Sequence, residues 1–146
     1  MNDNDLNRLS HLLSKQLDLQ NDLLILEESK TKVLIDGDIP QLEEIMRQEQ
    51  SFFLKCDDQL NKYQTFLNEI GLCGVTLRRI VAKYDAQNSF QLSAKLDNLE
   101  DILSCLKKTN NVNNKILQSR LSVIVKCLSM IGLKGDTVTY NKDGHF

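Results

Sequence analysis

The sequence predicts an all-α protein: an elongated antiparallel helical bundle of three long helices plus one short helix, with a flexible C-terminal tail. Leucine dominates the apolar residues, tryptophan is absent, and Pro40 is the one proline in 146 residues, which is a composition typical of helices. Apolar residues also recur at spacings of three and four over three long segments, as they do on one face of an α-helix. We expect a single bundle domain over residues 1–133 and a tail over residues 134–146.

The first helix is expected to begin near Asp3 or Asn4, which are good N-cap residues, and to continue to about Ile35. Its apolar stripe is wide, which suits a bundle better than a two-stranded coiled coil. Residues 36–40 then read Asp-Gly-Asp-Ile-Pro. Glycine suits the end of one helix, and aspartate followed by proline suits the start of the next. A helical hairpin is therefore predicted here.

The second helix is expected from Ile39 to about Ile70. One row on it follows alternating spacings of four and three: Leu42, Met46, Glu49, Phe53, Cys56, Leu60, Tyr63, Leu67 and Ile70. Because Glu49 is the polar member of an otherwise apolar row, we expect it to face a lysine or to lie at a wetter layer of the bundle.

A short helix is expected from Leu77 to about Tyr84, because Thr76 is a suitable N-cap. Residues 85–89 then read as a turn or loop. The long final helix starts soon afterwards and is expected from Leu92 to Ile131.

The final helix carries a strict 4-3 seam, which keeps one face toward a partner helix. Its members are Leu92, Leu96, Leu99, Leu103, Leu106, Asn110, Asn113, Leu117, Arg120, Ile124, Cys127 and Ile131. Asparagine stabilises a buried seam little by itself, so the pair either fixes the register of the bundle or contacts a bound partner. Beyond the pair the apolar surface broadens through Leu121, Val123, Val125 and Leu128. That surface is either core covered by the first and short helices or a groove for an amphipathic client helix.

Composition and motifs argue against several other classes of protein. The formal net charge is -2, so the chain lacks the excess of basic residues that is typical of nucleic-acid-binding proteins. No apolar run is long enough to span a membrane, and the N-terminal residues do not read as a signal peptide, so we expect a cytoplasmic protein without membrane insertion. The four cysteines form no C-x-x-C pair and are expected to be reduced and partly buried.

The sequence also offers no residues for catalysis or for a metal. No glutamate has a histidine three residues later, and neither His11 nor His145 has ligands at a convincing spacing. A Walker A loop and a nucleophile elbow are absent. We expect no enzymatic activity, no metal and no cofactor.

Four segments resemble the FlgN family of flagellar type III export chaperones. Residues 23–45, a leucine-rich helix followed by Gly-Asp and a Leu-Glu helix start, are similar to the first hairpin of the family. The family's N-x-x-N-x-x-L element is similar to the segment that begins at Asn110 and Asn113. Asn111 and Asn114 have the same spacing one residue later, so they are the alternative match. Residues 139–144 resemble its Thr-Tyr and glycine tail, and residues 71–80 resemble its middle junction.

The resemblance implies a cytoplasmic chaperone that binds the C-terminal amphipathic helices of hook-associated proteins, prevents their premature assembly and delivers them to the export gate. On this interpretation the client-binding residues are Asn110, Asn113, Leu117, Leu121, Ile124, Val125 and Leu128. Tyr140 matches a family tyrosine implicated in docking to the membrane protein of the gate; the alternative is an ordinary tail residue. We expect a monomer or weak homodimer that binds no nucleic acid. The competing hypothesis is a self-associating coiled-coil structural or adaptor protein.

Overall fold

The computed structural model describes residues 1–133 and consists there of four helices without strands. They are α1 (Asp3–Asp36), α2 (Ile39–Glu69), α3 (Leu77–Tyr84) and α4 (Leu92–Met130). The all-α class and the order of three long helices and one short helix are confirmed. The predicted tail and Tyr140 lie outside the described residues.

The helix ends follow from local side chains. The N-cap of α1 is Asn2, one residue before the expected start, because its side chain accepts a hydrogen bond from the Asp5 N–H at 2.8 Å. Asp5 accepts in return from the Asn2 N–H at 3.2 Å, which completes a capping box. In the hairpin, Gly37 adopts a φ of 74° and donates to the Val33 carbonyl, while Asp38 caps α2. The predicted hairpin is confirmed.

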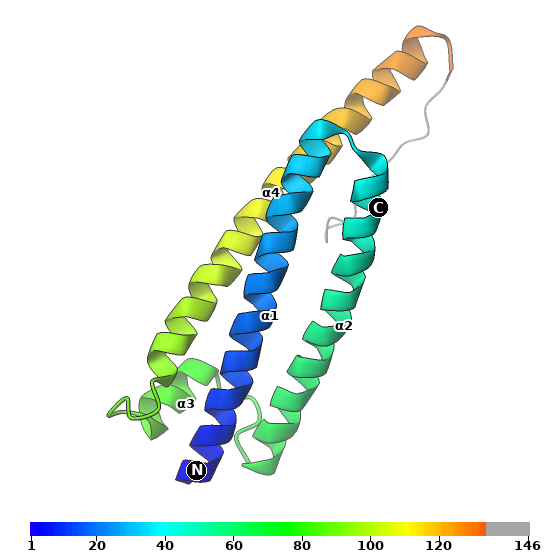
Figure 1. Cartoon of the computed structure of the whole chain (residues 1–146). Coiled ribbons are helices and arrows are strands. Elements are labelled where there is room, and N and C mark those ends of the chain that lie inside the picture. Colours follow the sequence, from blue (N-terminus) through cyan, green and yellow to red (C-terminus); the bar gives the residue numbers. More distant parts are fainter. Residues whose placement is uncertain (134–146) are drawn as a thin grey trace.

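The three long helices lie side by side, with α1 in the middle (Figure 1). Helix α1 packs against both α2 and α4, and α3 packs against α4. Helix α2 runs antiparallel to both long neighbours, so α1 and α4 are parallel. Lys95 near the start of α4 accordingly bonds Ser10 near the start of α1, and Arg120 bonds the Ile35 carbonyl near the end of α1.

The apolar core is divided into two parts of unequal size. The larger cluster lies at the end of the bundle that carries α3, and all four helices contribute to it: Leu6, Leu9, Leu13, Phe66, Leu67, Ile80, Val81, Leu92 and Leu96. The smaller cluster lies closer to the hairpin and contains Leu23, Leu26 and Ile45. Within the described part of the chain, the half near the hairpin therefore has a thinner core and no fourth helix.

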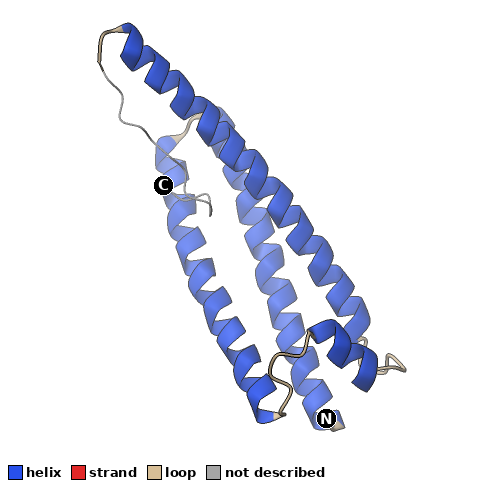
Figure 2. Ribbon diagram, turned by 180° about the vertical axis from the view of Figure 1, so that it is seen from behind, coloured by secondary structure: helices blue, strands red, loops and turns tan. Residues whose placement is uncertain are grey.

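The C-terminal end of α4 extends beyond the α1–α2 hairpin in both views (Figures 1 and 2). Ile124 is 54% exposed and Met130 is 82% exposed. Within residues 1–133, neither α1 nor α3 covers this segment, which disfavours the alternative that it forms ordinary core. No helix in that range is sufficiently long and apolar to cross a membrane.

The cysteines differ from their expected burial. Cys56 is half-buried, whereas Cys73, Cys105 and Cys127 are exposed. Cys105 and Cys127 are on α4, whose neighbours cover only part of its surface. All four thiols are free.

Candidate functional site

A groove of about 610 Å³ lies between α2 and α4, with α1 as its floor. Its two walls come from residues 42–53 of α2 and residues 106–117 of α4. Each wall spans about 17 Å at ~1.5 Å per residue, which is about three turns of helix. The groove therefore has the length of a short helical segment.

The apolar wall of α2 arises from the 4-3 row seen in the sequence. Ile45 and Glu49 are buried, while Met46 and Phe53 line the groove and are 45% and 42% exposed. The row is wider than the surface that α1 can cover, and among residues 1–133 no fourth helix packs over this part of α2. Met46 and Phe53 were not recognised as site residues from the sequence, because the row shows an apolar face without showing which of its residues line a groove.

The lining of the groove is arranged in three layers along its length. The layer near the hairpin is apolar and contains Leu42, Met46 and Leu117. The middle layer is polar and contains Glu27, Lys30, Glu49, Gln50, Asn110 and Asn114. The layer toward α3 contains Leu23, Phe53 and Leu106, with Lys107 beside them. We call the middle set the polar layer.

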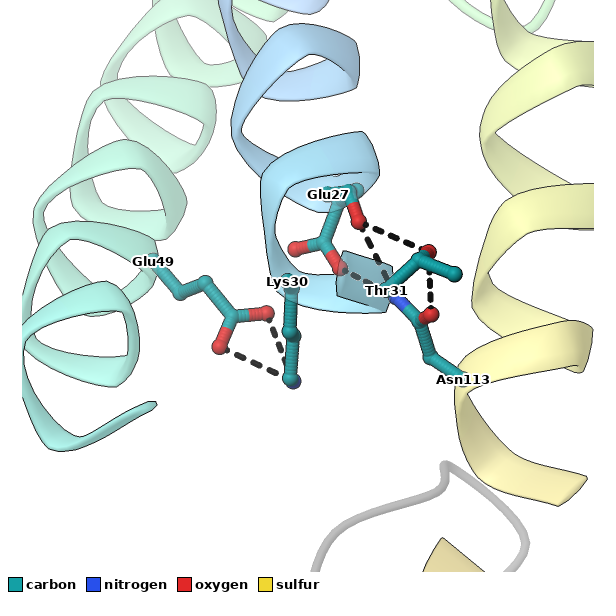
Figure 3. A network of polar contacts seen from close by, with 5 residues as sticks. All are labelled: Glu27, Lys30, Thr31, Glu49 and Asn113. Carbon is teal, nitrogen blue, oxygen red and sulfur yellow. Dashed lines mark hydrogen bonds and ion pairs between the residues drawn. The ribbon is translucent and has the colours of Figure 1, made fainter. Parts of the chain in front are cut away.

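An ion pair joins α1 and α2 within the polar layer (Figure 3). Lys30 Nζ lies 3.0 Å and 3.1 Å from the two carboxylate oxygens of Glu49. The two side chains are only 15% and 10% exposed. The prediction that Glu49 faces a lysine is confirmed, and the pairing explains how a charged residue is accommodated in an apolar row.

Asn113 joins α1 to α4 on the other side of the floor (Figure 3). It is 1% exposed, and its amide nitrogen donates to the Glu27 carbonyl at 3.2 Å. The Thr31 hydroxyl donates to the Asn113 amide oxygen. The expected contact of Asn113 with a client is therefore not supported, because its side chain is buried and already bonded to α1. Its geometry fits the alternative, a residue that fixes the register of the bundle.

Glu27 has an unusual protonation equilibrium. Its burial and the neighbouring carboxylate of Glu49 raise its pKa to about 8, although Lys30 and Asn113 partly offset this effect. At neutral pH the Glu27 carboxyl is thus predominantly protonated, and the charges of Lys30 and Glu49 balance each other. The polar layer is close to electrically neutral.

The remaining predicted site residues fall into two adjoining regions. Asn110 and Leu117 line the groove. Leu121, Ile124, Val125 and Leu128 lie on the projecting end of α4, where Ile124 is 54% exposed, Val125 is 38% exposed, and the other two are half-buried. The groove and the projecting end follow one another along the same helix.

Together the fold and the groove define a class of protein: a small, elongated α-helical bundle with a groove between two of its long helices. The profile of the family described as "FlgN protein" matches residues 1–145, and the chain belongs to this family of flagellar export chaperones. A relative described as "Uncharacterized protein YvyG", from Bacillus subtilis (strain 168), is 27% identical over 133 residues, covering 85% of this chain and 79% of the relative. No solved structure matches the chain.

Proposed function

We propose that this chaperone binds the C-terminal amphipathic helices of hook-associated proteins, the components of the hook–filament junction. It keeps these helices from assembling prematurely and delivers their proteins to the type III export gate from the cytoplasm. Membership of the FlgN family supports a flagellar client. The observation that carries the proposal is the groove between α2 and α4, whose walls have the length of a short helix.

The groove and the projecting end of α4 suit a client helix. Such a helix presents apolar anchors at spacings of three, four and seven residues. We propose that Asn110 and Leu117 contact it in the groove, and that its continuation contacts the apolar residues of the projecting end, which are Leu121, Ile124, Val125 and Leu128. A client helix covered in this way cannot pair with other subunits, because its apolar face is already buried.

Binding of a hook-associated protein from the same bacterium tests the client surface. The affinity of its C-terminal fragment for the chain is measured by calorimetry, with circular dichroism as the check of folding. Two variants place a carboxylate on the proposed surface: Met46→Asp in the groove, and the double variant Leu121→Asp with Ile124→Asp on the projecting end. Each is expected to weaken binding at least about tenfold, because an unpaired carboxylate would be desolvated. Leu54→Asp, at a position that is 71% exposed and outside the groove, is the matched control. Unchanged affinity in stably folded variants would contradict the proposed surface.

We also propose that the tail, through Tyr140, docks the loaded chaperone on the membrane protein of the export gate. Deleting residues 134–146 is expected to leave client affinity unchanged and to weaken binding to the cytoplasmic part of the gate. Tyr140→Ala in the full chain is expected to reproduce the loss. If the deletion instead abolishes client binding, the tail has a different role.

Self-association is the second candidate, because the end of α4 exposes apolar side chains such as Val123, Met130 and Ile131. Light scattering distinguishes the two functions. A monomer or weak dimer that binds client supports the chaperone, whereas a stable high-order oligomer without client affinity supports a scaffold.

A further inference from the structure

The polar layer divides the groove into two apolar halves, so an occupying helix must pass a polar zone at its middle. Three amide side chains line that zone: Gln50 on the α2 wall, and Asn110 and Asn114 on the α4 wall. No hydrogen bond within residues 1–133 engages any of these three side chains, whereas Glu49 and Lys30 engage each other. Both walls therefore offer, in the polar layer, amide donors and acceptors that have no hydrogen-bond partner within residues 1–133.

Covering this zone with an apolar side chain would be unfavourable. Each amide would lose water without gaining a partner, and the Lys30–Glu49 pair would be desolvated further. Leaving a polar group unsatisfied on burial costs more than a made hydrogen bond gains. A helix that is apolar along its whole stripe is consequently a poor occupant.

A charged side chain at the same place is also disfavoured. A carboxylate would approach Glu49, and an ammonium group would approach Lys30 and Lys107, which all line the groove. Within the polar layer Lys30 and Glu49 already pair with each other, so neither charge finds a free counter-charge in that layer. Lys107 in the adjoining layer favours a carboxylate over an ammonium group, so the Glu peptide is expected to bind better than the Lys peptide but worse than the Asn peptide. An uncharged amide both donates and accepts, so it complements the amides of the two walls.

We propose that the groove selects an amphipathic helix whose apolar stripe is interrupted at its middle by one asparagine or glutamine, with apolar anchors three or four residues to either side. The assignment of such a helix to an export client rests on the proposed function, whereas the selectivity of the groove does not. The polar layer would act as a register mark, because only one placement of the helix brings its amide to the amides of the chaperone.

Synthetic helices test the selectivity directly. The probes are four fluorescent amphipathic peptides of identical sequence except for a central Asn, Leu, Lys or Glu on the apolar face. Their affinities for the full chain are measured by anisotropy at concentrations where each peptide is monomeric. The Asn peptide is expected to bind best, about tenfold tighter than the Leu peptide. Equal affinities, a preference for the Leu peptide or no binding of any peptide would overturn the proposal.

A specificity reversal provides the second test. The triple variant Gln50→Leu, Asn110→Leu and Asn114→Leu is expected to prefer the Leu peptide over the Asn peptide. Asn111→Leu, which changes an exposed neighbour outside the groove, is expected to keep the original order. Should the triple variant not fold, the ranking of the four peptides on the wild-type chain still decides the question.

A hook-associated protein added as competitor separates this inference from the proposed function. If it displaces the Asn peptide, both are supported. If it binds without displacing the peptide, the groove is not the client site, although the chaperone function stands. If it does not bind at all, the proposed function fails, and the peptide ranking alone decides whether the groove is selective.

Discussion

Asn113 and Asn110 lie three residues apart on α4 and have different environments. Asn113 is buried against α1, whereas Asn110 is exposed and lines the groove. The 4-3 spacing predicted that both residues belong to one seam, but it did not show which part of the seam α1 covers. The lysine partner of Glu49 was predictable, because an unpaired charge in an apolar row is too costly to be left buried.

Replacing Asn113 by alanine should destabilise the fold by about 1–3 kcal/mol, because it removes the hydrogen bonds of a fully buried side chain to α1 and leaves a cavity in its place. Asn111→Ala is the matched control, since Asn111 is exposed on the same helix, and should change stability by less than about 0.5 kcal/mol. Urea denaturation measures both. Equal effects of the two substitutions would contradict the role of Asn113 in joining α1 to α4.

Glu27 should make stability depend on pH in a direction opposite to that of a salt-bridged carboxylate. Its pKa is raised from 4.5 to about 8 in the folded protein, so between these values the folded state binds a proton that the unfolded state has lost. Stability from this group therefore falls as pH rises through that window, by up to about 1.4 kcal/mol per pH unit. Glu27→Gln should remove this contribution.

The measurement is the difference in free energy of unfolding between the wild type and Glu27→Gln at several pH values from 5 to 9. The variant should gain relative stability as pH rises. Glu28→Gln, at the exposed neighbouring position, should run parallel to the wild type. A constant difference for Glu27→Gln would show that Glu27 titrates normally.

At the scale of the elements, α4 is held along α1 up to Arg120, and within residues 1–133 the segment after Arg120 projects beyond the hairpin (Figure 1). The Arg120 guanidinium donates to the Ile35 carbonyl at 2.7 Å and lies against Gly37, where an added Cβ would come within 3.1 Å of Arg120 Nη1. This contact fastens α4 to the hairpin. The caps at Asp38, Thr76 and Gly37 were readable from the sequence because each depends on its own short segment.

Hydrogen exchange should show this division of α4. Amides of residues 121–130 should be at least about tenfold less protected than those of residues 99–113, because only the latter segment is packed against α1. Arg120→Ala should move the boundary of weak protection toward Asn113. Lys126→Ala, which changes an exposed cation on the projecting end, should not. Uniform protection along α4 would indicate that the end is covered in solution.

At the scale of the whole molecule, the two cores suggest an uneven distribution of stability. Four helices meet at the larger core, whereas among residues 1–133 α1 alone packs against both α2 and α4 around the groove. The sequence predicted the number and order of helices. It could not predict the open side between α2 and α4, because an apolar row has the same pattern whether it faces its own chain or a partner.

A leucine-to-alanine substitution should therefore lower the free energy of unfolding by different amounts at two positions along α1. Leu9→Ala, in the larger core at 0% exposure, should cost about 2–5 kcal/mol. Leu26→Ala, in the smaller core at 9% exposure, should cost less, because neighbours beside the open groove can relax or admit water. Chemical denaturation of both variants checks the order. A larger loss for Leu26→Ala would contradict the division of the core.

The parallel arrangement of α1 and α4 also polarises the molecule along its length. The C-termini of α1 and α4, with their unpaired backbone carbonyls, both point toward the hairpin end of the molecule. Helix α2 alone has its N-terminus at that end, and its N-cap is the anionic Asp38. The Arg120 guanidinium offsets the negative C-terminal end of the α1 dipole by bonding the Ile35 carbonyl. The last turn of α4 carries no basic side chain that could do the same. The tip of α4 is thus a negative pole, and a partner that places a lysine or arginine beside it gains about 0.3–1 kcal/mol, an advantage that salt should screen.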